Sequence, residues 1–224
     1  MYPMNKILSD YRLYIFYVFS LFISSLGVAF SVKAELGTSP LVAIPNVLSI
    51  LFPIFSIGIY SMIFNIMLIL LELIILRSKF PKIQYLQFFV AIIYGYFIDM
   101  SLYLIRGLNP FNYIVQWVFC VVGAVILAFG IYLQLKSAIV YLPIDGFVLS
   151  IAYIKNSVYS KIKPFVDISL IVIAAIISLY YINGLVGVRE GTIFAALFVG
   201  PLVGFYKRHC DDSINRHFKF LNNQ

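Results

Sequence analysis

A few acidic and amide side chains interrupt long apolar runs of the sequence, and these are the residues that could bind a solute or carry a proton. Asn65, Asp99, Asp145 and Asp167 each lie within or beside such a run. An ionisable side chain at the centre of a membrane helix costs about 2.5–3.5 kcal/mol on insertion scales. Each acid therefore needs a bonding partner or a function, and the amide needs a hydrogen-bond partner.

Two of the acids have a local partner in the sequence. Asp167 follows Lys163 by four residues, a spacing that places both on one helix face and favours an ion pair. Asp145 follows Pro143 by two residues, in the first turn of a predicted helix, where the helix dipole favours an anion. Capping of that helix and binding of a cation, proton or amine are both open interpretations of Asp145.

The other two residues have a structural and a functional interpretation as well. Asp99 either bonds to a neighbouring helix or the outer interface, or it is a site acid that faces Lys33 or Arg106. Asn65 lies in the middle of an apolar run, where a buried amide either joins two helices or contacts a ligand.

The octet "KAELGTSP" at 33–40 is the most polar break in an otherwise apolar region. A lysine beside the free amides of a following helix attracts anions, although a lysine that reaches to the membrane surface is ordinary. Lys136 occupies the corresponding place in a later break, "KSAIVYLP". The candidate binding residues in the two breaks are Lys33, Glu35, Thr38, Ser39 and Lys136, and the structural breaks are Gly37, Pro40, Pro143 and Gly146.

Composition places these residues in a membrane protein. The chain has 224 residues, of which 62% are hydrophobic and 11% are charged, against about 25% charged in soluble domains. Continuous apolar runs of about 20 residues predict membrane-spanning helices and an all-α fold. The net charge of +7 is explained by membrane topology, so we expect no nucleic-acid partner. The predicted spans are 13–32, 56–76, 84–105, 113–135, 165–182 and 190–206.

The distribution of basic residues predicts the orientation. With the N-terminus in the cytoplasm, all Lys and Arg residues except Lys33, Arg106 and Arg189 fall on the cytoplasmic side. Residues 1–12 and 207–224 are then cytoplasmic tails, and the protein is a multi-pass protein of the cytoplasmic membrane.

Two further apolar segments, 39–52 and 142–153, are too short to cross a bilayer and each starts with a proline in its first turn. We interpret them as half-helices, either re-entrant or interfacial, with Ser39 as an N-cap of the first. A shift of 103 residues places "GVAFSVKAELGTSP" on "GIYLQLKSAIVYLP". Residues 13–106 and 113–206 therefore read as two three-span repeats, and an odd number of spans gives them inverted topology.

The segments "GVAFSVKAELGTSP", "FSIGIYSMI", "YGYFIDM", "PIDGFVLS" and "TIFAALFVGPLVGF" resemble the YczE/YyaS/YitT-like bacterial integral membrane proteins. The resemblance covers roughly residues 20–207. It implies a bacterial cytoplasmic-membrane protein whose activity is poorly defined, with transport and support of secondary-metabolite synthesis among the roles of relatives. Asp145 and Gly146 match the second motif, whereas Val42 stands where relatives usually carry an acid.

Two functions fit these features. The first is a small-solute transporter or exporter that works by alternating access, coupled to protonation of Asp145 or Asp167. The second is a non-transporting accessory protein that holds a partner enzyme or pathway component. No catalytic grouping, metal-ligand spacing or phosphate loop is present, so we expect no enzyme activity, no metal and no cofactor. The expected partners are the lipid bilayer and an unknown small molecule, and a homo-oligomer or protein partner stays open.

Overall fold

The chain is an all-helical bundle in a computed structural model that describes residues 11–137, 139–211, 214, 216 and 218. The predicted tails, 1–12 and 207–224, fall largely outside the described residues. The helices are α2 (Tyr11–Lys33), α3 (Pro40–Leu51), α4 (Ile57–Leu76), α5 (Gln87–Leu104), α6 (Tyr113–Ser137), α7 (Pro143–Ile154), α8 (Tyr159–Ile182) and α9 (Glu190–His209), with the short 3-10 turns η1 (Arg77–Lys79) and η2 (Lys82–Leu86) between α4 and α5.

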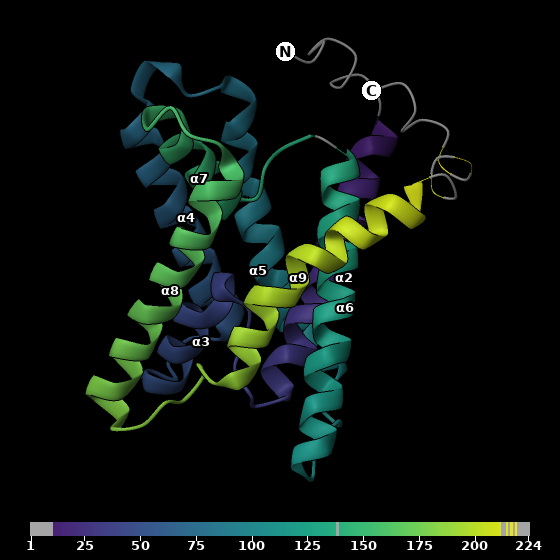
Figure 1. Ribbon diagram of the computed structural model, residues 1–224, viewed down its shortest axis with the longest axis vertical. Coiled ribbons are helices and arrows are strands. Elements are labelled where there is room, and N and C mark those ends of the chain that lie inside the picture. Colours follow the sequence, from purple (N-terminus) through teal and green to yellow (C-terminus); the bar gives the residue numbers. More distant parts are fainter. Residues whose placement is uncertain (1–10, 138, 212–213, 215, 217, 219–224) are drawn as a thin grey trace.

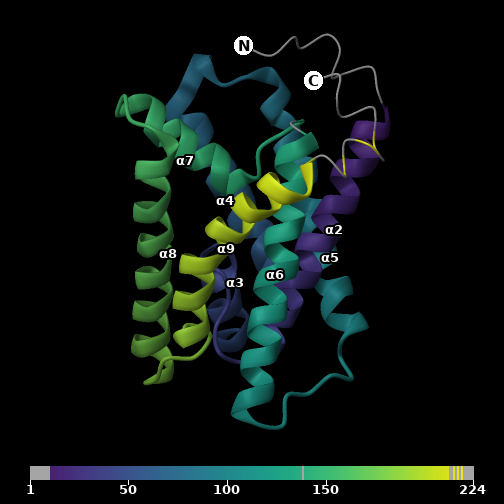
Figure 2. The ribbon, with the colours of Figure 1, turned by 45° about the vertical axis from the view of Figure 1, so that its right-hand side comes forward.

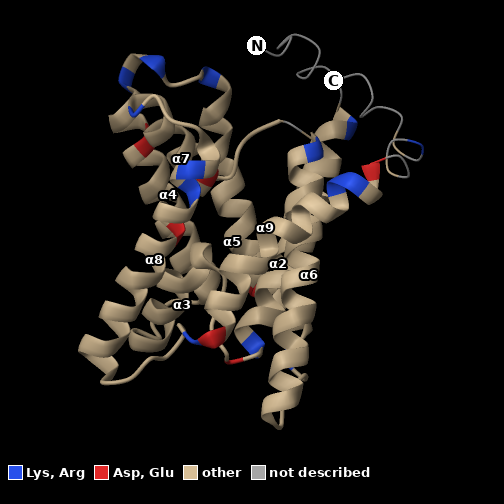
Figure 3. Cartoon of the chain, viewed as in Figure 1, with Lys and Arg blue, Asp and Glu red and all other residues tan. Residues whose placement is uncertain are grey.

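Five helices, α2, α4, α5, α6 and α8, are long and apolar enough to cross a membrane. The protein is therefore a multi-pass helical membrane protein, as its composition predicts. The long helices alternate in direction along the chain (Figures 1 and 2). Lysine and arginine gather toward the end of the bundle where α2 begins and α9 ends, and the middle of the bundle is mostly uncharged (Figure 3).

One helix begins earlier than its apolar run indicates. The predicted fifth span starts after Pro164, but α8 starts at Tyr159 and passes through this proline. Proline is best tolerated near the start of a helix, where few intrahelical bonds are lost. The lysine before it, Lys163, forms ion pairs with two carboxylates.

The two half-helices α3 and α7 have 12 residues each and begin in the interior of the bundle. Pro40 and Pro143, at their first turns, are buried, and the residues that follow the helices are exposed. Ser39 is the N-cap residue of α3, as predicted, but its side chain makes no capping hydrogen bond. Instead the Ser39 carbonyl accepts a bond from the Val42 amide.

The most extensive helix pair is α2 with α6, in the centre of the bundle. The backbones approach so closely that a Cβ on Gly27 would overlap the backbone of Leu127, and one on Gly130 would overlap Ser24. Helix association in lipid depends on packing and on polar contacts rather than on the hydrophobic effect, and small residues permit both. Gln134 donates from Nε2 to the Ser24 hydroxyl at 2.7 Å, which adds a hydrogen bond across the same pair.

The remaining helices attach to this pair and to the half-helices. α5 packs on α2, and α9 packs on α6. α3 packs on α8 and α4, whereas α7 packs on α4 and α8. α4 also packs on α5, but α8 and α9 make no comparable contact within the described residues.

The close approach of α2 and α6 predicts that a methyl group at the crossing destabilises the protein. We expect Gly27→Ala and Gly130→Ala each to cost about 1–3 kcal/mol, because the backbones must separate. Thermal unfolding of the purified protein in detergent measures the effect as a lower apparent Tm.

Gly204→Ala is the matched control, since Gly204 lies in a helix but a Cβ there meets nothing within 4 Å. Alanine stabilises a helix by about 1 kcal/mol relative to glycine, so we expect this variant to keep or raise the Tm. Equal losses in all three variants would contradict the proposed importance of the crossing.

Candidate functional site

A cluster of two carboxylates, one ammonium and one phenol joins α7 to α8. Lys163 Nζ lies 3.4 Å from Asp145 Oδ1 and 3.1 Å from Asp167 Oδ1. The Tyr159 hydroxyl donates to Asp145 Oδ1 at 2.6 Å. The structure thus confirms the ion pair predicted from the spacing of Lys163 and Asp167, and it adds Asp145 from a different helix.

Local sequence explains how these side chains reach one another. Pro143 starts α7, so Asp145 lies in the first turn, where the free amides and the helix dipole favour a negative charge. Tyr159, Lys163 and Asp167 are spaced by four residues and share one face of α8. Because α7 packs on α8, that face meets the first turn of α7.

The charges of the cluster do not balance, since it holds two carboxylates and one ammonium. The side chains of Lys163, Asp145 and Asp167 are only 27%, 19% and 20% exposed, so water screens them weakly. A proton or a small cation would restore neutrality. The arrangement is therefore suited to hold one further positive charge at the start of the half-helix.

The predicted residues at the opposite break are held in structural contacts. Lys33 Nζ donates to the Arg106 carbonyl at 3.2 Å and to Asn109 Oδ1 at 3.3 Å. Glu35 has a positive φ of 58°, and its carbonyl accepts a bond from Arg189 at 3.2 Å. These bonds join the end of α2 to the loops before α6 and α9.

The loop between Glu35 and α3 packs directly against the start of α9. Gly37 has a φ of 96°, and a Cβ there would overlap Thr192 Oγ1 and the Arg189 amide. The Gly191 amide donates to the Leu36 carbonyl at 2.8 Å. Thr38 is buried, and its hydroxyl has no hydrogen-bond partner among the described residues. Gly37 is thus a structural break, whereas Thr38 offers an unused hydroxyl inside the protein.

Asp99 and Asn65 lie in different surroundings. Asp99 accepts hydrogen bonds from the Ser56 hydroxyl and, at 2.9 Å, from the Gly58 amide, so it caps α4 from the neighbouring helix α5. The structural interpretation of Asp99 accounts for both contacts. Asn65 is 2% exposed on α4, and its Oδ1 has no partner among the described residues.

Lys136 ends α6 and pairs with Asp211 beyond α9, with 3.0 Å between Nζ and Oδ1. Tyr132 donates to the same carboxylate at 2.7 Å. Partial burial tends to raise the pKa of Asp211, but the Tyr132 bond and the Lys136 ammonium hold that pKa below its usual value. This pair ties the end of α9 to α6.

Sequence reasoning missed two groups near the α7 break. Tyr159 belongs to the charge cluster, and its spacing from Lys163 was a usable signal. The sequence places Glu72 near Arg77, which predicts an ion pair, but Gln87 on α5 donates to the Glu72 carboxylate at 3.2 Å instead. Arg77 begins η1 with a positive φ of 49°, so the chain turns sharply there and the expected helical spacing does not apply.

Comparisons with known proteins agree with the resemblance seen in the sequence. A model described as a family of unknown function (DUF6198) matches residues 11–208. The chain is 25% identical over 206 residues to the uncharacterized protein YyaS of Bacillus subtilis (strain 168). The alignment covers 92% of this chain and 95% of that protein. No solved structure matches the chain.

The cluster on α7 and α8 predicts that Lys163 is needed mainly to balance its two acids. Lys163→Met leaves both carboxylates without a cation, and we expect it to lower the free energy of unfolding by about 1–3 kcal/mol. Breaking a fully buried ion pair costs roughly 3–5 kcal/mol, and the loss here is smaller because the cluster is only partly buried. Addition of Asp145→Asn and Asp167→Asn to this variant restores most of the stability. Thermal unfolding in detergent measures all three steps, with the neighbouring exposed Lys161→Met as control. A triple variant no more stable than Lys163→Met would contradict the charge argument.

Proposed function

The chain belongs to the family DUF6198, and we propose that it is a small-solute transporter or exporter that works by alternating access between two inverted repeats. The repeats are residues 13–106 and 113–206. α9 is the sixth span in this proposal, beside the five helices that are long and apolar enough to cross a membrane. The bacterial cytoplasmic membrane is its location, with both termini in the cytoplasm.

The positions of the helices support the repeat. Pro40 and Pro143, the first residues of the half-helices, are 103 positions apart, and so are Gln87 and Glu190, the first residues of α5 and α9. Equivalent elements also pack alike, since α5 lies on α2 as α9 lies on α6. Each half-helix packs on a long helix of the other repeat, α3 on α8 and α7 on α4.

The contacts between α2 and α6 support the same register. Gly27 faces Leu127, and Gly130 faces Ser24. A shift of 103 converts the first pair into the second, because it takes Gly27 to Gly130 and Ser24 to Leu127. A two-fold axis between α2 and α6 accounts for this exchange, and such an axis is frequent in secondary transporters.

The observation that carries the proposal is a difference in helix packing between the two repeats. α4 packs closely on α5, with Gly58 and Gly95 facing each other, but the equivalent helices α8 and α9 lack such contact. Gly200 and Gly204 on α9 have open space where a neighbouring helix would lie. Because the two repeats are equivalent, each can adopt the conformation that the other has in this structure. That exchange of conformations would open the protein alternately to the two sides of the membrane.

The charge cluster gives the exchange a coupling element. Asp145 and Asp167 belong to α7 and α8, and movement of α8 toward α9 would separate Asp167 and Lys163 from Asp145. A proton or cation bound at this cluster therefore biases the two conformations, provided that it binds one of them better.

The exchange predicts two distances between α8 and α9. Spin labels at Ile176→Cys and Phe198→Cys, both exposed, would report a long distance for the described state and a shorter one for the exchanged state. Cys120→Ala and Cys210→Ser remove the native thiols. Pulsed electron paramagnetic resonance of protein in lipid nanodiscs measures both populations.

The label pair Ile15→Cys and Leu135→Cys on α2 and α6 is the control, because these helices stay together through the exchange. A single α8–α9 distance under all solutes and pH values would favour the alternative function, a non-transporting accessory protein. Isolation of a bound protein partner would then be the next measurement.

The orientation is tested by the reaction of single cysteines with a membrane-impermeant maleimide in intact cells. In a variant without native thiols, Gly184→Cys lies in the predicted outer loop, and Asn156→Cys and His209→Cys lie on the predicted inner side. We expect labelling of the first alone, with all three labelled after the cells are opened. Labelling of His209→Cys in intact cells would mean that α9 does not cross the membrane.

A further inference from the structure

A buried carboxylate with no cation partner lies one turn before the end of α4. Glu72 is 3% exposed, and it forms no ion pair with any described residue. Among the described residues its carboxylate accepts a hydrogen bond from Gln87 Nε2, which also donates to Gln84 Oε1 at 2.8 Å. One shared amide compensates a carboxylate poorly in a weakly hydrated interior, so Glu72 favours a proton or a cationic ligand.

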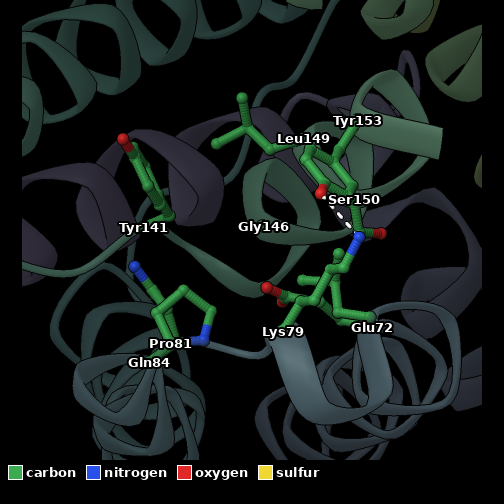
Figure 4. Close-up of a pocket in the computed structure, with 10 residues that line it drawn as sticks. Glu72, Lys79, Pro81, Gln84, Tyr141, Gly146, Leu149, Ser150 and Tyr153 are labelled. Carbon is green, nitrogen blue, oxygen red and sulfur yellow. Dashed lines mark hydrogen bonds between the residues drawn. The ribbon is translucent and has the colours of Figure 1, made fainter. Parts of the chain in front are cut away.

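The carboxylate lies in the wall of a cavity of about 420 Å³. Glu72, Gln84, Gly146 and Ser150 are buried in its wall, whereas Lys79, Tyr141 and Tyr153 are among its exposed lining residues and mark its opening (Figure 4). The volume exceeds what a bare metal ion needs and falls within the range of small-molecule sites.

The lysine at the opening is directed to a tyrosine. Lys79 Nζ donates to the Tyr153 hydroxyl at 3.0 Å and lies 5.2 Å from the centre of its ring. The Glu72 charge therefore remains available to a ligand. The position of Lys79 also shows that an ammonium group is accommodated beside this aromatic ring.

We propose that this cavity binds a small organic ammonium compound, with the ammonium group at Glu72 and the hydrocarbon part among Leu76, Leu149 and the tyrosines. The buried carboxylate favours a positively charged ligand. The apolar and aromatic lining favours a ligand with a hydrocarbon part over a hydrated inorganic ion. Nothing in the sequence pattern marks the site, because its residues come from α4, the η turns and α7.

Gly146 connects the cavity to the half-helix. A Cβ at this position would overlap Glu72 Oε2 and Gln87 Nε2, so the first turns of α7 lie directly on the carboxylate. The residue before it, Asp145, belongs to the α8 cluster. The binding site stands on its own residues, whereas identification of the bound amine as the transported solute rests on the proposed function.

Isothermal titration of the purified protein with 2-phenylethylammonium tests the site, with 2-phenylethanol as the neutral isostere. We expect the wild type to bind the amine and to bind the alcohol at least about tenfold more weakly, since a charged hydrogen bond is lost. Glu72→Gln keeps the size of the side chain and removes its charge, and we expect a similar loss of amine affinity. Glu190→Gln, at a partly exposed carboxylate in another part of the molecule, keeps full affinity.

Leu149→Trp is a second test that does not depend on the stability of the Glu72 variant. Leu149 is partly exposed and lines the cavity, so a larger side chain fills the space without a change of charge. We expect loss of amine binding with an unchanged Tm in the absence of ligand. Amine affinity unchanged in Glu72→Gln and Leu149→Trp, or stronger binding of 3-phenylpropanoate than of the amine, would overturn the proposal.

The same ammonium chemistry is present in soluble amines and in the phosphatidylethanolamine headgroup. Titration in nanodiscs of phosphatidylglycerol alone and of phosphatidylglycerol with phosphatidylethanolamine separates the two sources. Weaker amine binding in the second lipid mixture assigns the site to the headgroup, and equal binding assigns it to a free amine. Amine binding that depends on Glu72, together with a single α8–α9 distance, would retain the site and reject the transport mechanism.

Discussion

The close approach of α2 and α6 is the constraint on which the rest of the bundle depends. Lipid tails are as apolar as leucine, so two spanning helices gain little by hiding hydrophobic side chains from them. Gly27, Gly123 and Gly130 remove the side chains that would separate the helices, and the Gln134–Ser24 hydrogen bond fixes their register. α5 and α9 then pack on opposite members of this pair, and the other helices follow from those positions.

The half-helices place polar groups where spanning helices cannot. Each begins in the interior, so the amides of its first turn and the residues beside them are held away from bulk water. Around the first turn of α7 this has a particular result: Glu72 lies against it from α4, and Lys163 with Asp167 approaches it from α8. A small movement of one short helix therefore changes the surroundings of three carboxylates together.

The two ends of the bundle use their charges differently. At the α3 end, Lys33 donates to the Arg106 carbonyl and to Asn109. Arg189 donates to the Glu35 carbonyl and pairs with Glu190, so these charges stabilise loops. At the α7 end, carboxylates outnumber the ammonium group that they share, and the Glu72 carboxylate lies in a cavity. This difference is a reason to look for ligand binding and coupling at α7 rather than at the octet 33–40, which first attracts attention in the sequence.

From the sequence alone we predict the helical class, six apolar spans of which five are helices long and apolar enough to cross a membrane, the two short helices and the Lys163–Asp167 pair. These depend on local properties: apolar runs of membrane length, proline in a first turn and side chains four residues apart on one helix. The packing of the helices establishes that Asp145 joins that pair, that Asp99 caps α4 and that Glu72 contacts Gln87 rather than Arg77. Such contacts join helices far apart in the chain, and hydropathy does not encode which helix faces lie together. The glycines are an intermediate case, because their spacing is visible in the sequence, whereas the backbones that they admit are known only once the helices are packed.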